Sequence, residues 1–276
     1  MKKRIRTALL VFFSATLILS VFMLSAYYIE GYLQKKQTDA LLALKQEAST
    51  PRPTIQPEEN PEPQPDTPQE PTLVTVTHPK TGEQVSLLPD FAELFTQNPD
   101  IVGWLSIPGT DISYPVMQTP NKPNYYLRRG FDKKYSTRGC LYAREECDVF
   151  APTDNVTIYG HRMRDGSMFA QLERFKNQQF QKENPYIYFD TLTELHTYEV
   201  FAVFLTTATQ GEGFAYHSFI QAASPEEFDT FVENCRSLSM YNTGIVPQYG
   251  DTLITLSTCD YFDDNGRLVV VARRVG

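Results

Sequence analysis

The sequence contains little cysteine and little histidine, with four residues of each among 276. Four cysteines in a chain of this length exclude the small disulfide-stapled domains of secreted proteins. No cysteine or histidine pair has zinc-site spacing, and the glycine patterns of nucleotide-binding loops are absent. The acid-rich stretch DYFDDNG is no EF-hand, because with Gly266 sixth, Tyr261 and Ala272 would stand at the first and twelfth ligand positions. We therefore expect no metal ion and no cofactor.

Positive charge is also scarce. The chain has 25 lysine and arginine residues against 33 acids, a formal charge of -8 and a pI near 5.1. Because nucleic acids bind to basic surfaces, this balance argues against a nucleic-acid partner. The first 36 residues are the exception, with six basic residues and one acid, Glu30. The rest of the chain is therefore distinctly acidic.

One long hydrophobic run lies near the N-terminus. Residues 8–29 carry no charge, and 22 residues at about 1.5 Å each are enough for a helix to cross a bilayer. Four of the first six residues are basic, which by the positive-inside tendency keeps the N-terminus cytoplasmic and exports the rest. A cleaved signal peptide is the alternative, but its apolar region usually has only about 7 to 15 residues. We expect residues 1–36 to be a cytoplasmic tip and an uncleaved single-pass membrane anchor.

Residues 37–72 have the composition of a spacer. A short amphipathic stretch near DALLALKQEA is expected to be helical. Residues 49–72 then hold eight prolines, several acids and almost nothing that could be buried. Proline-rich chain extends at about 3.1 Å per residue. We expect a short helix and a linker that holds the following domain away from the membrane.

Residues 73–276 have the size of a single domain, rich in short strands. Strands are predicted within residues 101–118 on both sides of the turn Pro108-Gly109, and at 139–143, 155–161, 186–190, 196–207, 251–259 and 267–275. Helices are predicted at 86–100, from residue 167 to 175, and at 224–238, where Ser224, Pro225 and Glu227 form a capping box. Because strands and helices do not alternate, the pattern favours a mainly β fold, a closed β-barrel with peripheral helices, over a doubly wound sheet.

The four cysteines differ in their surroundings. Cys235 shares the apolar face of helix 224–238, so we expect it to be buried as a small hydrophobic residue. Cys140 and Cys147 flank LYAREE, and their separation alone leaves pairing, free thiols and burial open. Cys259 ends one strand, and Arg267 opens the next after a seven-residue loop. If these strands pair as a hairpin, the two side chains stand side by side at one end of the sheet.

A thiol beside a guanidinium has the makings of a nucleophilic site. A cation stabilises a neighbouring thiolate and can hydrogen-bond an oxyanion on an acyl intermediate. Such a nucleophile also needs a proton donor for the leaving amine, and histidine is the usual choice. Among the four histidines, His161 is the best partner, because it ends strand 155–161 and follows a glycine. Spacing alone also fits the simpler interpretation, in which Cys259 is packed, Arg267 is solvated and His161 is structural.

Four sequence blocks bear a family resemblance. NPDIVGWLSIPGTDISYPVMQ, YYLRRGFDKKYSTRG, IYGHRMRDGSMFAQL and TLSTCDYFDDNGRLVVVARR resemble, in this order, the conserved blocks of class B sortases over roughly residues 91–276. The resemblance implies an eight-stranded sortase β-barrel with extra helices and a Cys-His-Arg site carried by Cys259, His161 and Arg267. Arg128-Arg129 and Gly139-Cys140 depart from the family pattern, which bears on the preferred motif and not on the reaction.

The resemblance also implies a reaction and its partners. The thiolate attacks the carbonyl after threonine in a C-terminal sorting motif of an exported protein, and a peptidoglycan amine then accepts the acyl group. Ser257, Thr258 and Asp260 flank the nucleophile and are expected to shape the substrate pocket. The family's substrate loop falls near residues 206–220, which makes Thr206 and Thr207 further substrate-binding candidates. Two alternatives stay open: a wall-associated cysteine peptidase or amidase, and a catalytically inactive surface-binding module on the same barrel.

Overall fold

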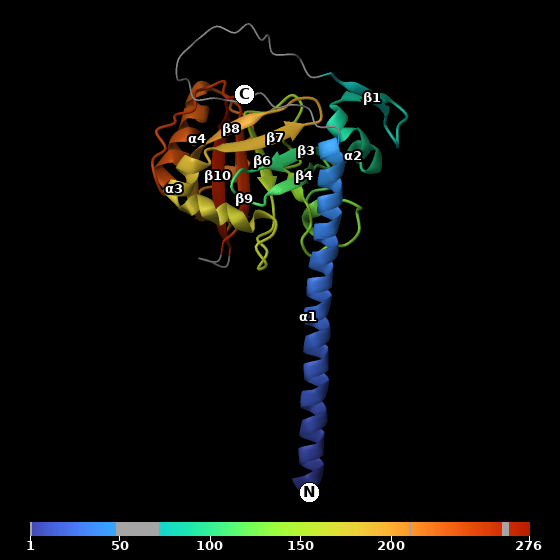
Figure 1. The fold of residues 1–276 in the computed structure, drawn as a ribbon. Coiled ribbons are helices and arrows are strands. Elements are labelled where there is room, and N and C mark those ends of the chain that lie inside the picture. The colour runs from blue at the N-terminus through green and yellow to red at the C-terminus, as the bar shows by residue number, and fades with distance from the viewer. Residues whose placement is uncertain (1, 48–71, 210, 261–264) are drawn as a thin grey trace. The chain divides into compact units, whose positions relative to one another are not determined.

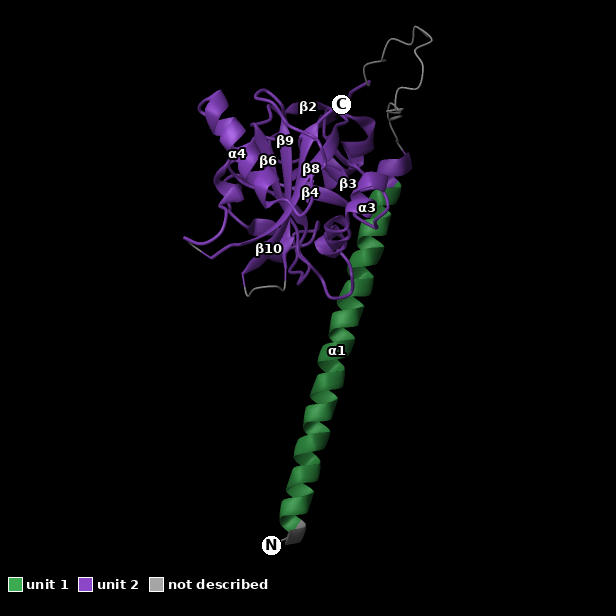
Figure 2. Ribbon diagram, turned by 90° about the vertical axis from the view of Figure 1, so that its left-hand side faces the viewer, with its two compact units in different colours: residues 1–43 green, residues 44–276 purple. Residues whose placement is uncertain are grey.

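The computed structural model describes residues 2–47, 72–209, 211–260 and 265–276. These residues fall into two compact units, residues 1–43 and residues 44–276 (Figure 2). Nearly all of the predicted proline-rich linker, and Tyr261 of the rejected EF-hand, lie outside the described residues.

The first unit is part of one long helix, α1 (Lys2–Glu47). The helix runs without a break through the boundary expected at residue 36, because no proline interrupts residues 2–47. The short helix expected as a separate element after that boundary is therefore the last part of α1. The hydrophobic side chains of its first half are exposed, and its most apolar window has a mean hydropathy of 2.4. By length and composition, α1 is able to cross a membrane.

The second unit contains a closed eight-stranded barrel (Figure 1). In chain order its strands are β3 (Ile101–Ser106), β4 (Ser113–Met117), β5 (Leu141–Ala143), β6 (Asn155–Tyr159), β7 (Tyr186–Thr191), β8 (Thr197–Thr207), β9 (Leu253–Cys259) and β10 (Gly266–Arg274). They are hydrogen-bonded in the order β10-β8-β7-β3-β4-β5-β6-β9, with closure between β9 and β10. The predicted barrel is confirmed, with every predicted strand in place to within a few residues.

The helices and a hairpin lie outside the barrel strands. A two-stranded sheet of β1 (Val74–Thr77) and β2 (Gln84–Leu87) was not predicted from the sequence. The helical elements are η1 (Pro89–Phe91), α2 (Ala92–Gln97), η2 (Tyr125–Arg128), η3 (Phe169–Lys176), α3 (Gln178–Glu183), η4 (Tyr216–Ser218) and α4 (Pro225–Leu238). The helix expected at 86–100 is shorter, since β2 takes its first residues and Pro89 starts a 3-10 turn. The backbone N–H of Glu227 donates to the Ser224 hydroxyl (3.3 Å), so the predicted cap of α4 is confirmed.

The side chains of β10 are divided between two hydrophobic clusters, one on each face of the strand. Leu268, Val270 and Ala272 of β10 point into the barrel interior. The alternate residues Val269 and Val271 point outward and pack in a second cluster with α4. All five are fully buried, because β10 is covered on both faces.

The predicted burial of one cysteine is confirmed on α4. Cys235 is fully buried in the second cluster, together with Phe228, Phe231 and Val232 of the same helix. Positions 228, 231, 232 and 235 follow the i, i+3, i+4, i+7 pattern of one helix face, the face that covers β8 and β10. Burying each phenylalanine contributes roughly 1.5–3 kcal/mol to stability. Helix α4 therefore covers one side of the barrel, and its cysteine, Cys235, is too deeply buried to react.

Candidate active site

Three strand ends meet at one edge of the barrel. β6 and β9 are parallel neighbours, with Tyr159 opposite Ser257, so their carboxyl ends lie together. His161 follows β6 by two residues, and Cys259 is the last residue of β9. β10 runs antiparallel to β9 and pairs Arg267 directly with Cys259. The barrel topology therefore brings together three residues that are far apart in the sequence.

These residues line a single cavity of about 410 Å³. The cavity is lined by Asn124, Leu127, Tyr142, Arg144, Glu145, Glu146, Tyr159, Gly160, His161, Ser257, Thr258, Cys259 and Arg267. Its wall thus combines a thiol, an imidazole and a guanidinium with apolar, aromatic and carboxylate side chains. Among the described residues, no three His, Cys, Asp or Glu side chains gather as metal ligands.

The imidazole of His161 is oriented by a backbone carbonyl. Its Nε2 lies 2.8 Å from the Leu127 carbonyl oxygen. Because a carbonyl only accepts hydrogen bonds, Nε2 carries the proton, and Nδ1 of the neutral ring is the acceptor. Burial lowers the pKa of His161; the Leu127 carbonyl raises it in part, and the charge of Arg128 lowers it further. The imidazole is therefore mainly neutral near pH 7.

The guanidinium of Arg267 is held by its own turn. Nη1 donates to the carbonyls of Asn265 (3.1 Å) and Gly266 (2.9 Å). Nη1 bears only two of the five guanidinium N–H donors. The charge of Arg267 also acts on two buried tyrosines. Burial raises the pKa of Tyr142 and of Tyr216, and the charge of Arg267 lowers the pKa of both in part. The side chain thus combines a fixed position with additional donors for an oxygen that carries developing negative charge.

Two hydroxyls behind the cavity tie its strands together. Thr258 Oγ1 donates to the Gly160 carbonyl (2.8 Å), which links β9 to the residue before the imidazole. The Ser257 hydroxyl and the Tyr216 hydroxyl lie 2.6 Å apart. Ser257 and Thr258 are both 2% exposed. They line the cavity as predicted and in addition fix the backbone on which Cys259 sits.

The site matches a known family in sequence and in structure. The Sortase domain family model matches residues 105–275. Sortase B of Listeria monocytogenes is 31% identical over 198 residues, which cover 70% of this chain and 76% of the relative. The chain belongs to the sortase family, in class B. Sortases are cysteine transpeptidases, so this chain is an enzyme of that type.

Solved sortases of class B share the fold of this one. Sortase B from Bacillus anthracis in complex with AAEK2 superposes with a TM-score of 0.68 at 29% identity, covering 88% of this chain and 96% of that one. The Staphylococcus aureus sortase B-substrate complex gives 0.63 at 28% identity, covering 68% of this chain and 86% of that one. The predicted class and the predicted barrel are therefore confirmed together.

Asp260 does not line the catalytic cavity of this sortase, in contrast to the expectation from its position beside Cys259. Its side chain is 5% exposed and lies 2.5 Å from Lys176 Nζ. The ion pairs with Lys176 and with Arg162 hold this carboxylate away from the cavity lining. Asp260 is therefore a partner of η3 in this structure, and its predicted contact with substrate stays a prediction.

Thr206 and Thr207 also lie outside this cavity. They sit at the end of β8, opposite Arg267 and Gly266 of β10. Both line a second, more open hollow of about 780 Å³ together with Leu238. The Thr206 hydroxyl accepts a hydrogen bond from the backbone N–H of a loop residue (3.0 Å). Their contact with substrate stays a prediction, and it would lie outside the cavity that contains Cys259.

Several residues of the cavity were not predicted from the sequence. Leu127 orients His161 through its backbone carbonyl, a group that every residue type has, so the sequence does not indicate this contact. Arg144 pairs with Glu146 (2.8 Å) and donates to the His217 carbonyl (2.6 Å), which joins the β5 end to η4. For Arg144, Glu145 and Glu146 the sequence did contain an indication, since three consecutive charged residues directly after a strand are typical of a loop, where binding residues are common.

Only one of the four thiols of this sortase is expected to react quickly in the folded state. All four are free, and Cys259 alone is exposed. Burial raises the pKa of Cys140, of Cys147 and of Cys235. Brief alkylation of the native enzyme should therefore add one adduct, at Cys259, and alkylation after denaturation should add four, as read by intact mass. A second adduct forming at the same rate would contradict the structure.

Gly160 is expected to tolerate no side chain. A Cβ there would lie 2.5 Å from Leu141 Cδ2 and 2.6 Å from Phe169 Cδ2. Both neighbours are fully buried, so Gly160→Ala should cost about 1–3 kcal/mol, measured by urea unfolding. Unchanged stability of the variant would show that Leu141 and Phe169 move aside freely.

The pKa of His161 sets a pH dependence. Because burial lowers this pKa below its ordinary value of 6.5, an NMR titration of the imidazole should give a midpoint below 6.5. The unfolded chain takes up this proton near pH 6.5 and the folded enzyme does not, so this histidine makes stability fall as the pH drops through 6.5. Arg128→Gln should raise the midpoint, since the charge of Arg128 lowers it. A midpoint above 6.5 would contradict this placement of the ring.

Proposed function

We propose that this sortase is a membrane-anchored enzyme that cleaves a C-terminal sorting motif of exported proteins and transfers the acyl group to a peptidoglycan amine. The observation that carries the proposal is the common cavity of Cys259, His161 and Arg267. A thiol nucleophile, a proton carrier and a fixed cation are the three parts that acyl transfer between amines requires.

Acylation is the first half of the proposed reaction. The Cys259 thiolate attacks the carbonyl carbon after the motif threonine, and the carbonyl electron pair moves onto oxygen. Arg267 donates hydrogen bonds to that oxyanion. When the oxyanion collapses, the C–N bond breaks and the leaving amine takes a proton from the His161 imidazolium. Because His161 has a lowered pKa, the form with thiolate and imidazolium is a minority at neutral pH.

Transfer is the second half. The acceptor amine attacks the thioester carbon, and neutral His161 takes the proton that the amine gives up. The C–S bond then breaks, an amide is left on the acceptor, and the Cys259 thiolate returns to its starting state. Glu145 on the cavity wall suits an acceptor that arrives as an ammonium ion. That ion gives one proton to water before it attacks, and His161 takes the second proton as the amide forms.

The proposed location follows from α1. Its apolar, exposed first half has the length of a bilayer crossing. The basic residues before it favour a cytoplasmic N-terminus, with the barrel on the outside of the cell membrane. Exported proteins with a sorting signal and the wall amine are both found on that side.

The test uses the full chain in detergent with candidate sorting peptides, with and without an amine acceptor. Amide product that depends on the amine, together with a thioester on the enzyme, supports transpeptidation. Hydrolysis at a rate insensitive to the amine supports a peptidase. A chain that forms no thioester with any sorting peptide contradicts the proposal and favours a surface-binding module.

A further inference from the structure

A group of four charged side chains, two of them largely buried, lies next to the proposed catalytic residues. It consists of Arg162, Glu173, Lys176 and Asp260, which we call the Asp260 cluster. Asp260 Oδ2 lies 2.5 Å from Lys176 Nζ and 3.7 Å from Arg162 Nη1. Glu173 pairs with the same two cations, at 2.7 Å from Arg162 and 3.2 Å from Lys176. Two anions and two cations thus balance one another.

The positions of two of these residues in the chain are informative. Arg162 directly follows His161, and Asp260 directly follows Cys259. Neighbouring Cα atoms are only about 3.8 Å apart, so a shift of either charged residue moves the catalytic residue before it. The ion pair between Arg162 and Asp260 therefore spans the same gap as the proposed catalytic pair, on the other side of the backbone.

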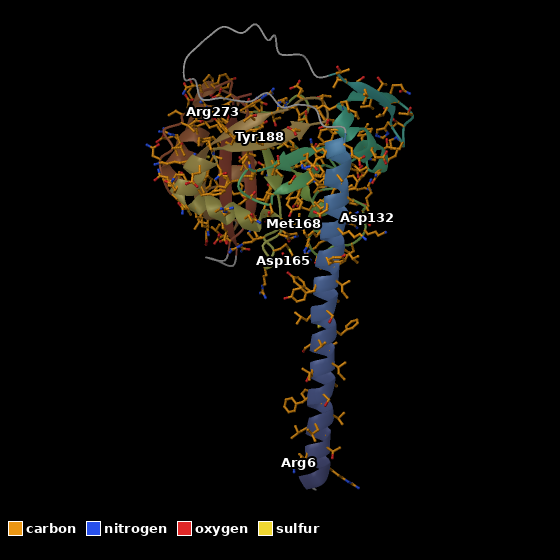
Figure 3. All side chains as sticks on the ribbon, viewed as in Figure 1. Arg6, Asp132, Asp165, Met168, Tyr188 and Arg273 are labelled. Carbon is orange, nitrogen blue, oxygen red and sulfur yellow. The ribbon has the colours of Figure 1, made fainter. Side chains whose placement is uncertain are left out.

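The short helix η3 completes this connection. It contributes both Glu173 and Lys176, and the backbone N–H of its first residue, Phe169, donates to the His161 carbonyl (2.9 Å). η3 thus contacts the imidazole loop through its backbone and the nucleophile strand through Lys176 and Asp260. Figure 3 labels Asp165 and Met168, which lie in the loop between His161 and η3.

The burial of two members of the cluster, Asp260 and Arg162, argues against a role in solubility. The side chains of Asp260 and Arg162 are 5% and 16% exposed. Removing charges from water costs free energy that ion pairing only roughly offsets, so such a cluster is weak evidence for stability. Each buried charge must nevertheless keep its partner, and this requirement fixes the distance between the segments that carry the charges.

We propose that the Asp260 cluster is a positioning device that sets the distance between the Cys259 sulfur and the His161 imidazole. Asp260 and Arg162 act through the residues before them and do not touch substrate. The inference rests on the proposed function, because it assigns a role in the acylation step of that reaction. It also gives Asp260 a role that its place beside the nucleophile concealed.

The size of the effect on rate separates positioning from a charge effect. Loss of the Asp260 negative charge favours the Cys259 thiolate and disfavours the His161 imidazolium, so the two electrostatic effects oppose each other, and electrostatics alone would change the acylation rate of an Asp260→Asn variant little. Positioning predicts a clear loss of rate. A misplacement of about 1 Å costs up to about 100-fold in rate, so acylation should slow by roughly 10- to 100-fold.

The experiment compares thioester formation by the full chain in detergent, in the wild type and in Asp260→Asn, well below the unfolding temperature of each. We expect the acylation rate constant to fall roughly 10- to 100-fold, while KM for the sorting peptide stays within about twofold because the pocket wall is unchanged. Asp260→Glu, which keeps the charge, should recover part of the rate.

Glu199→Gln is the matched control. Glu199 pairs with Arg273 (3.4 Å) near the opposite end of β10, and Figure 3 shows Arg273 far from Asp165. This variant should lower the thermal midpoint without changing the acylation rate of the folded protein. The double variant Asp260→Asn/Lys176→Met restores the charge balance, so it should recover stability and remain slow.

Three results would overturn the inference. One is an Asp260→Asn variant that acylates at the wild-type rate, and another is a loss matched by Glu199→Gln. The third is a double variant whose rate recovers together with its stability, which would make the cluster merely structural. A wild type that forms no thioester would instead remove the proposed function, and this inference with it.

Discussion

Replacing Cys259 with alanine is expected to abolish acyl-enzyme formation, with a loss of about 10⁴-fold or more in the rate of motif cleavage. The reason is chemical: without the sulfur there is no nucleophile to form the thioester. The fold should survive, because the thiol is exposed at the barrel edge, so the free energy of unfolding should change by less than about 0.5 kcal/mol. Intact mass after incubation with peptide measures the first effect, and urea unfolding measures the second.

Cys235→Ala is the matched control for that variant. Cys235 is fully buried under α4, so its truncation leaves a cavity in the second hydrophobic cluster. We expect this variant to lose stability and to keep the acylation rate of the folded enzyme. Wild-type cleavage by Cys259→Ala would remove this thiol from the mechanism.

Arg267→Lys is expected to lower the acylation rate by about 100- to 1,000-fold, the usual effect of losing one oxyanion donor. Lysine keeps the charge but lacks the planar fork, in which one nitrogen is held by the turn carbonyls of Asn265 and Gly266 while the other N–H groups face an oxyanion. Single-turnover kinetics with a saturating sorting peptide measures the effect.

Arg273→Lys serves as the control for Arg267→Lys. Arg273 lies on the same strand, opposite Leu253 of β9, and pairs with Glu199. It should retain near-wild-type acylation, because its pair can re-form with an ammonium group. If Arg267→Lys also kept the wild-type rate, charge alone would suffice at position 267, and the planar donor fork would have no role in stabilising the oxyanion.

The strands and the hairpin that pairs Cys259 with Arg267 were predictable because their signals are local. Runs such as residues 251–259 and 267–275 are apolar and bounded by turn residues, and a short loop between two strands predicts a hairpin. That hairpin alone places Arg267 opposite Cys259, as observed. His161 required more, since only the parallel pairing of β6 with β9 brings it to the same edge. Its position at a strand end makes His161 the best candidate among the four histidines, and the fold places it in the cavity.

Other parts of the site depend on contacts that residue type does not encode. Every residue has a backbone carbonyl, so only the position of Leu127 in space makes its carbonyl the one that orients His161. Asp260 reads as a pocket residue by proximity to Cys259, but its role depends on Arg162 and Lys176, which are 98 and 84 positions away in the chain. The change in composition near residue 36 predicts a boundary, but α1 continues to Glu47, because helices end at specific residues and not at changes in polarity.

The central claim is that the Cys259 sulfur carries an acyl group from one amine to another. Peptide mapping of the enzyme after a short reaction with a sorting peptide, before and after addition of an amine acceptor, tests it most directly. We expect an adduct with the mass of the N-terminal peptide fragment on Cys259, which disappears as the amide product forms. An adduct on another residue, or amide product formed while Cys259 stays unmodified throughout, would contradict it.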